Sequence, residues 1–226
     1  VPLACDVFLG NVFAFAPGVE KKPAYPQGFA WRPPFNASFR LDRSPAGMAQ
    51  ATELYLAARS SAGPRWADPQ YAPAGAQERA QAAAGLIVPG ASVLDLGCGA
   101  MALRALLPPS CRYTPADLVA RSEDTVLVDL NQGQFPEGRF DVAVLLQVLE
   151  SMHQPEQVLA NCQQAASTLI LSYETFPGGE KKTRRERGFF NDLSERDIDT
   201  LLKKTGWRAD MRGQRGETLM LRCVAV

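Results

Sequence analysis

The residues best suited to chemistry in this sequence are acidic side chains at the ends of predicted strands, beside a glycine-rich loop. The first is Asp95, in a short apolar run that predicts a parallel strand buried on both faces, and Gly97, Cys98 and Gly99 follow it. Glycines let the backbone turn sharply and approach a ligand without a Cβ clash. The carboxylate can accept hydrogen bonds from an ammonium group and favours a nearby positive charge. The stretch therefore predicts a ligand-binding turn.

Two further acids stand at the ends of the next predicted strands. The segment Cys111–Asp117 ends in a carboxylate about twenty residues after the glycine loop, where an acid meets the ribose hydroxyls of a nucleotide cofactor. Taken alone, that acid could equally be a surface residue closing a strand. The segment Thr125–Val128 predicts a third strand that ends at Asp129, whose carboxylate can accept a hydrogen bond from an adenine amino group. With Asp95, these acids favour a cationic ligand over an anionic pyrophosphate.

The glycine loop alone leaves the ligand open. The pattern Gly97-x-Gly99-x-x-Ala102 also fits the dinucleotide fingerprint of NAD-binding enzymes. A tight strand-to-helix turn that binds nothing is a third interpretation. We expect a helix over Met101–Leu107, ended by Pro108-Pro109, whose N-terminal N–H groups point at the ligand.

The rest of the sequence predicts the elements that hold these side chains. In chain order they are a strand over Phe140–Glu150, a helix that opens at Pro155, a strand over Thr168–Ser172, a helix over Leu193–Thr205 that Gly206 ends, and two strands over Trp207–Met211 and Thr218–Val226. Pro and Glu in a first turn are typical helix starts. Residues 212–217 join the last two strands.

Residues 92–175 resemble a class I S-adenosylmethionine (SAM)-dependent methyltransferase, and the pattern is closest to the small MetW-like methyltransferases. The matching segments are the glycine motif Val93–Leu103, the ribose acid Asp117, the adenine contact Asp129-Leu130, the strand Phe140–Glu150 and the helix Pro155–Leu159. The resemblance implies an α/β fold, a Rossmann-like seven-stranded, mostly parallel sheet flanked by helices, with an antiparallel last strand. It also implies a methyltransferase domain over 75–226 and an N-terminal cap or substrate region over 1–74.

The resemblance further implies SAM as the cofactor and S-adenosylhomocysteine as the product. The residues it places at the cofactor are Asp95, Gly97, Cys98, Gly99, Asp117, Leu118, Asp129, Leu130, Leu146 and Gln147. Two positions depart from the family pattern. Met101 replaces the third glycine, where its side chain could crowd the methionine end of SAM or pack into the core. Ser151 replaces the histidine that commonly follows the fourth strand.

The N-terminal third carries weaker signals. A helix is expected from Ser44-Pro45 to Arg59, and another over Gln77–Leu86, with a Pro/Gly/Ser-rich stretch between them. Val7–Phe15 is either a strand or a packed extended segment. The region is too apolar for a disordered segment, as its aromatic residues Trp31, Phe35, Phe39, Trp66 and Tyr71 indicate. A cap is therefore favoured over a flexible leader or a remnant of a longer chain, although the chain begins at Val1 and an upstream segment could have been removed.

Candidate catalytic residues lie near the ends of the predicted strands. Methyl transfer from a sulfonium depends mainly on proximity, and an oxygen or nitrogen acceptor also benefits from a base. The candidates near the strand ends are Glu150, His153, Tyr173 and Glu174, and a catalytic role is predicted for the last three. His153 is the only histidine, and Tyr173 and Glu174 end the fifth predicted strand. For each of them a surface or packing role is the plainer alternative. The basic run Lys181–Arg187 could attract a phosphate or carboxylate of the acceptor, or be a solvated helix start.

Composition limits the remaining possibilities. The formal net charge of zero gives no general attraction to nucleic acid, and the five cysteines lack the CxxC spacing of a zinc site. No membrane-length apolar stretch or secretion signal is evident, so we expect a cytoplasmic protein without a metal, and without nucleic-acid or membrane partners. The predicted function is SAM-dependent methylation of an oxygen or nitrogen of a small-molecule or glycan-like acceptor. The alternatives are a SAM-binding, methyltransferase-like regulatory partner protein and a nucleotide-dependent oxidoreductase.

Overall fold

A computed structural model describes residues 42–68, 70, 71 and 73–226 of the chain. The predicted segment Val7–Phe15, the aromatic residues Trp31, Phe35 and Phe39, and Cys5 lie outside the described residues. No helix within the described ranges is both long and apolar enough to cross a membrane.

Seven strands form one sheet in the order β3-β2-β1-β4-β5-β7-β6. Their bounds are β1 Ser92–Leu96, β2 Arg112–Asp117, β3 Val126–Leu127, β4 Phe140–Leu146, β5 Ala166–Glu174, β6 Trp207–Arg215 and β7 Thr218–Ala225. Strand β7 runs antiparallel to both of its neighbours, and the other pairings are parallel. The expected seven-stranded, mostly parallel sheet with an antiparallel last strand is therefore confirmed.

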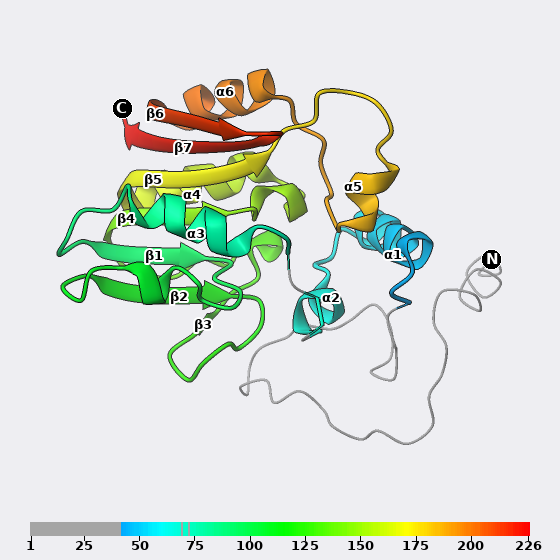
Figure 1. Cartoon of the computed structure of the whole chain (residues 1–226), viewed down its shortest axis with the longest axis horizontal. Coiled ribbons are helices and arrows are strands. Elements are labelled where there is room, and N and C mark those ends of the chain that lie inside the picture. The colour runs from blue at the N-terminus through cyan, green and yellow to red at the C-terminus, as the bar shows by residue number, and fades with distance from the viewer. Residues whose placement is uncertain (1–41, 69, 72) are drawn as a thin grey trace.

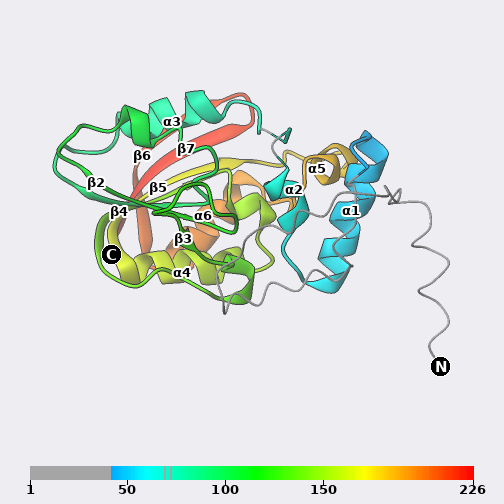
Figure 2. The same cartoon turned by 90° about the horizontal axis from the view of Figure 1, so that it is seen from below.

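Helices cover both faces of the sheet and the edge to which the parallel strands point (Figures 1 and 2). The helices are α1 Pro45–Ala58, α2 Gly63–Ala67, α3 Ala76–Ala84, α4 Pro155–Ala165, α5 Lys182–Glu186 and α6 Glu195–Lys204. Helix α3 packs on one face, and α4 and α6 pack on the other. Helices α1, α2 and α5 gather beyond the carboxyl ends of the parallel strands, where ligands bind in open α/β sheets.

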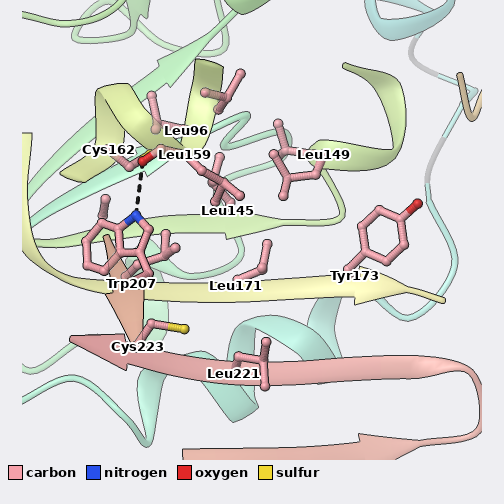
Figure 3. Close-up of a cluster of buried hydrophobic side chains, with 14 of the residues drawn as sticks. Leu96, Leu145, Leu149, Leu159, Cys162, Leu171, Tyr173, Trp207, Leu221 and Cys223 are labelled. Carbon is pink, nitrogen blue, oxygen red and sulfur yellow. Dashed lines mark hydrogen bonds between the residues drawn. The ribbon is translucent and has the colours of Figure 1, made fainter. Parts of the chain in front are cut away.

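The larger core lies between the sheet and helices α4 and α6 (Figure 3). Trp207 is 1% exposed, and its indole N–H donates to the carbonyl oxygen of Leu159 at 3.0 Å, which satisfies the one polar atom of a large apolar side chain. Helix α6 begins with a capping box in which the Ser194 and Asp197 side chains bond each other's backbone N–H groups. The Trp207 contact lies at the end of the sheet where β4 and β5 begin.

The prediction of a helix over Met101–Leu107 is wrong. The segment forms a single 3-10 turn, Arg104–Leu106. Pro108 pushes the residue before it into an extended conformation, and Leu107 has φ −75° and ψ 146°. Met101 has a left-handed φ of 55° at the other end of the segment, so only the 3-10 turn forms between them and no helix N-terminus points at the glycine loop.

Two other predicted bounds also change. The fourth strand stops at Leu146 rather than Glu150, because Gln147 adopts a left-handed φ of 59° and a 3-10 turn follows over Leu149–Ser151. Strand β6 runs on to Arg215, and Gly216, with φ 59°, makes a tight hairpin to β7. The charged residues assigned to a loop there are instead on an exposed edge strand.

Candidate cofactor site

One cavity of about 330 Å³ opens at the carboxyl ends of the parallel strands. Its size is in the range of small-molecule sites. All ten residues predicted to contact a cofactor line it, namely Asp95, Gly97, Cys98, Gly99, Asp117, Leu118, Asp129, Leu130, Leu146 and Gln147. They come from the ends of β1 to β4, so the sheet topology brings together side chains separated by up to about fifty positions.

Gly97 occupies a place where no side chain fits. It has φ +69°, and a Cβ there would lie 2.6 Å from Cγ2 of Val148. The N–H groups of Gly97 and Cys98 both donate to the carbonyl oxygen of Ala116, at 2.7 and 3.2 Å. The loop is therefore clamped to the end of β2 with its backbone exposed to the cavity, which allows a ligand close approach.

Asp95 is a buried carboxylate on the cavity wall and is 3% exposed. Its Oδ2 accepts a hydrogen bond from the Tyr113 hydroxyl at 2.6 Å. Burial raises the pKa of Asp95 to about 7, although the Tyr113 hydrogen bond opposes that rise. Because burial disfavours the charged form of Asp95, a ligand that brings a positive charge would stabilise this carboxylate.

The Asp117 side chain binds the backbone of the glycine loop. Its Oδ2 accepts from the N–H of Gly99 and its Oδ1 from the N–H of Val119, both at 2.9 Å. The guanidinium of Arg121 lies 3.6 Å from Oδ1. Each carboxylate oxygen keeps a further lone pair, so the side chain is fixed in place and can still accept from two ligand hydroxyls.

Asp129 is tied to a residue that the sequence did not single out. Its Oδ1 accepts from the hydroxyl of Ser61 at 2.6 Å and from the N–H of Asn131 at 3.0 Å. Ser61 precedes α2 by two positions and also lines the cavity. No sequence signal could have found this contact, because it joins positions 68 residues apart.

Gln147 presents an unsatisfied acceptor. Its backbone N–H donates to Ser172 Oγ at 2.9 Å, which holds the left-handed residue at the end of β4. Its side-chain Oε1 is buried and has no partner among the described residues. A buried amide oxygen without a hydrogen bond is costly, so a ligand donor in the cavity would stabilise it.

Arg79 is a second lining residue that sequence analysis missed. It projects from α3 and lines the cavity; its Nη1 donates to the carbonyl oxygen of Ala74 at 2.7 Å, and its Nε is buried without a described partner. Burial lowers the pKa of Arg79, and the nearby Glu150 carboxylate raises it. The available signal was a lone arginine in an alanine-rich helix just before the glycine strand.

The two departures from the family pattern leave the cavity open. Met101 has φ +55°, but its Sδ lies 3.6 Å from Ser122 Oγ and the residue does not line the cavity. It is partly exposed, so it neither crowds the cofactor site nor fills the core. Ser151 does line the cavity, and its hydroxyl donates to the carbonyl oxygen of Gly188 at 3.2 Å.

None of the three predicted bases lines the cavity. The His153 ring stacks on Phe190 with centroids 4.6 Å apart, and its Nε2 lies 3.1 Å from the carbonyl oxygen of Ser60. A carbonyl can only accept, so Nε2 carries the proton. Burial lowers the pKa of His153, and the side chain is therefore a neutral donor to the segment before α2.

Tyr173 and Glu174 lie together at the end of β5 and do not line the cavity. Tyr173 is fully buried; its hydroxyl donates to Asn191 Oδ1 at 2.5 Å and accepts from the N–H of Leu193 at 3.0 Å. Figure 3 shows its ring at the end of the core cluster. Glu174 pairs with Arg187. Their roles as bases stay predictions.

The basic run does not offer free charge to an acceptor through Arg184 and Arg185. Arg184 is 5% exposed, and both guanidinium groups pair with the carboxylate of Asp192, at 3.2 and 2.8 Å. Arg184 also donates to the carbonyl oxygen of Glu174 at 3.0 Å. The run does begin a helix, and Lys181 and Lys182 are exposed, but Arg184 and Arg185 are not solvated, because the partner acid Asp192 follows the run and folds back onto it.

The segment between α1 and α3 closes the cavity on the far side from the sheet. Trp66 and Tyr71 line it with their rings edge to face, 5.2 Å apart. The guanidinium of Arg65 lies 5.6 Å from the centre of the Tyr71 ring, and the Tyr71 hydroxyl donates to the carbonyl oxygen of Arg187 at 2.7 Å. These contacts hold an aromatic wall opposite the glycine loop.

Solved structures with similar folds are methyltransferases or biosynthetic proteins. The pyocyanin biosynthetic protein PhzM matches with a TM-score of 0.54 and 16% identity over 67% of this chain and 56% of its own. CalO1, the methyltransferase of calicheamicin biosynthesis solved with S-adenosylhomocysteine, gives 0.55 and 15% over 79% and 69%. The magnesium protoporphyrin IX methyltransferase from Synechocystis PCC 6803, solved with SAM, gives 0.54 and 19% over 85% and 100%. At these identities the likeness shows the fold.

The present chain thus spans little more than half of PhzM but the whole length of the Synechocystis enzyme. No curated protein sequence matches it. The family model described as "Methyltransferase domain" matches residues 68–210, which is more than half of the chain and includes every predicted cofactor contact. The protein therefore belongs to the methyltransferase-domain family.

Proposed function

We propose that this chain transfers a methyl group from SAM to an oxygen or nitrogen of a small-molecule acceptor bound beneath the aromatic wall of Trp66 and Tyr71. The observation that carries the proposal is the shared cavity. The ten expected cofactor contacts and these two aromatic side chains line the same space, so a cofactor and an acceptor bound there would meet.

The residues of the cavity fit SAM group by group. Asp117 would hold the ribose hydroxyls, Asp129 the adenine amino group and Asp95 the ammonium group, while Arg79 can pair with the carboxylate. Gly97 leaves room for a ligand where a Cβ would clash. When bound, SAM supplies an electrophilic methyl group on a sulfonium, and the protein's part is to hold that group in line with the acceptor atom.

The structure gives two reasons against NAD. Three buried carboxylates line the cavity and would repel a pyrophosphate. The dinucleotide fingerprint also needs a helix N-terminus behind the glycine loop to bind that pyrophosphate. Here the loop leads into the single 3-10 turn Arg104–Leu106. An oxidoreductase is therefore disfavoured by both charge and backbone geometry.

The acceptor is better matched by a small planar molecule than by a glycan. Trp66, Tyr71, Met152 and Leu146 give the cavity apolar and aromatic surface, and aromatic rings pack well against one another. The Synechocystis relative acts on a porphyrin and CalO1 serves calicheamicin biosynthesis, according to their descriptions. These relatives support a small-molecule acceptor without identifying it.

The assignment of a base remains a proposal for His153, Tyr173 and Glu174. Their present contacts point to positioning roles, because His153 donates to Ser60 and Glu174 pairs with Arg187. A base would give kcat a pH dependence that disappears in His153→Gln, whereas a positioning role would change KM and leave the pH profile of kcat in place.

The direct test is transfer of a radioactive methyl group from SAM to a panel of acceptors. The panel would contain planar phenols and aromatic amines, aliphatic amines and short oligosaccharides, and Trp66→Ala would be assayed beside the wild type. We expect product with planar acceptors and an acceptor KM raised about tenfold in the variant. Transfer to oligosaccharides alone would contradict the acceptor class, and SAM binding without transfer to any member would favour a regulatory partner protein.

A further inference from the structure

The segment before α2 is joined to the adenine end of the cofactor site by a chain of hydrogen bonds. Nδ2 of Asn131 donates to Ser61 Oγ at 3.0 Å, and the Ser61 hydroxyl donates to Asp129 Oδ1 at 2.6 Å. Since the Ser61 hydroxyl has one proton and Asn131 supplies a donor to it, the direction of both bonds is set. Ser61 is 4% exposed and Asp129 5% exposed, so both bonds are shielded from bulk water.

Asn131 is itself held on its remaining polar atoms. Its Oδ1 accepts from the N–H of His153 at 2.8 Å, and Nδ2 also donates to the carbonyl oxygen of Ser151 at 3.1 Å. The amide therefore cannot flip without losing three contacts. The network fixes Ser61 from one side and leaves its hydroxyl proton only Asp129 to bind.

These contacts decide which oxygen of Asp129 faces a ligand. Oδ1 accepts from both Ser61 and the N–H of Asn131, whereas no hydrogen bond to Oδ2 is found among the described residues. Asp129 lines the cavity, so Oδ2 is its available acceptor. A carboxylate oxygen fixed in this way attracts an amino group and repels a carbonyl oxygen.

We infer that Ser61 is a positioning residue that sets the preference of the cofactor site for an adenine amino group over a 6-oxo purine. The inference rests on the proposed function, because it takes SAM as the ligand. It assigns to the segment before α2 a part in cofactor selection, separate from any contact with the acceptor. Asp129 touches the base, and Ser61 acts through Asp129.

The test compares the dissociation constants of S-adenosylhomocysteine and S-inosylhomocysteine by calorimetry. The inosine base replaces the amino group with a carbonyl and leaves the ribose and amino acid unchanged. We expect the wild type to prefer the adenosine ligand, and Ser61→Ala to reduce that preference about fivefold or more, in the range expected for loss of a charged hydrogen bond. Ser61→Thr, which keeps the hydroxyl, should retain the preference.

Ser60→Ala is the matched control. The Ser60 hydroxyl lies one position away, is buried, and has no hydrogen-bond partner among the described residues. Equal weakening of both ligands by Ser61→Ala, or loss of preference in Ser60→Ala, would overturn the inference in favour of a purely structural role. Failure of the wild type to bind S-adenosylhomocysteine at all would instead contradict the proposed function.

Discussion

At the scale of single residues, Asp95 makes cofactor binding depend on pH. Burial raises its pKa to about 7 in the free protein, so below that pH the group is mostly protonated and a cationic ligand must displace a proton to bind. We predict that affinity for SAM weakens up to tenfold per pH unit below about 7. Calorimetry between about pH 5.5 and 7.5 would measure this, and release of a proton to the buffer would accompany binding at the acid end.

Tyr113→Phe is the companion variant for this prediction. It removes the hydroxyl that donates to Asp95, and that hydrogen bond favours the carboxylate. The acid limb of the affinity profile should therefore move to higher pH. A dissociation constant that stays constant across the range, in either protein, would show that Asp95 does not face the ammonium group.

The contact proposed between Arg79 and the cofactor carboxylate can be tested with an analogue that lacks this carboxylate. We predict that Arg79→Ala weakens SAM binding about tenfold or more, because a charged hydrogen bond is lost. Decarboxylated SAM, which has no carboxylate to offer, should bind the variant and the wild type alike. Gln77→Ala, exposed on the same helix, is the control. If Arg79→Ala weakened the binding of both ligands equally, Arg79 would not contact the cofactor carboxylate.

At the scale of elements, the strand ends were predictable and the contacts between distant segments were not. Apolar runs next to Asp95, Asp117 and Asp129 define β1 to β3 locally, and parallel pairing then places these acids at the same edge of the sheet. The helix after the glycine loop was wrongly predicted because Met101, its expected first residue, adopts a left-handed φ of 55°, which the sequence did not indicate. The partner of Asp129, Ser61, lies 68 positions away, and no local pattern encodes such a pairing.

For helix α5, too, the partners of the charged residues could not be predicted from the sequence. A run of basic residues reads as an exposed or ligand-binding segment when its partners are unknown. In the structure Asp192 accepts from Arg185 and pairs with Arg184. Burial alone would raise the pKa of Asp192, but the hydrogen bonds from Arg185 and Lys181 lower it. The two arginines therefore hold helix α5 against the segment that contains Asp192.

We accordingly predict that Arg184→Ala destabilises the fold. Asp192 would keep Arg185, but the buried acceptors that Arg184 binds, among them the carbonyl oxygen of Glu174, would lose their donor, at a cost of about 1 to 3 kcal/mol. Urea unfolding would measure the loss, and Lys182→Ala, exposed on the same helix, should be close to neutral. A higher acceptor KM without loss of stability would support the discarded view that Arg184 binds the acceptor.

At the scale of the whole molecule, two segments far apart in sequence pack against each other beyond the strand ends, and the first of them also lines the cavity. The segment 43–73 and the connection between β5 and α6 meet beyond the strand ends (Figure 1), where Thr52 Oγ1 donates to the carbonyl oxygen of Arg185 at 2.6 Å and Tyr71 donates to that of Arg187. The sheet thus supplies the acids, and the covering helices supply aromatic surface and Ser61. We propose that these two segments together form the cap expected from the N-terminal region.

The most direct test of the account is calorimetric titration of the wild type and Asp117→Ala with SAM, S-adenosylhomocysteine and NAD. Asp117 is central to the site, because it lines the cavity and is bonded to the glycine loop. The account predicts that both SAM ligands bind the wild type, that NAD does not, and that the variant loses at least about tenfold in affinity. Binding of NAD alone, or SAM binding unaffected by the loss of Asp117, would contradict it.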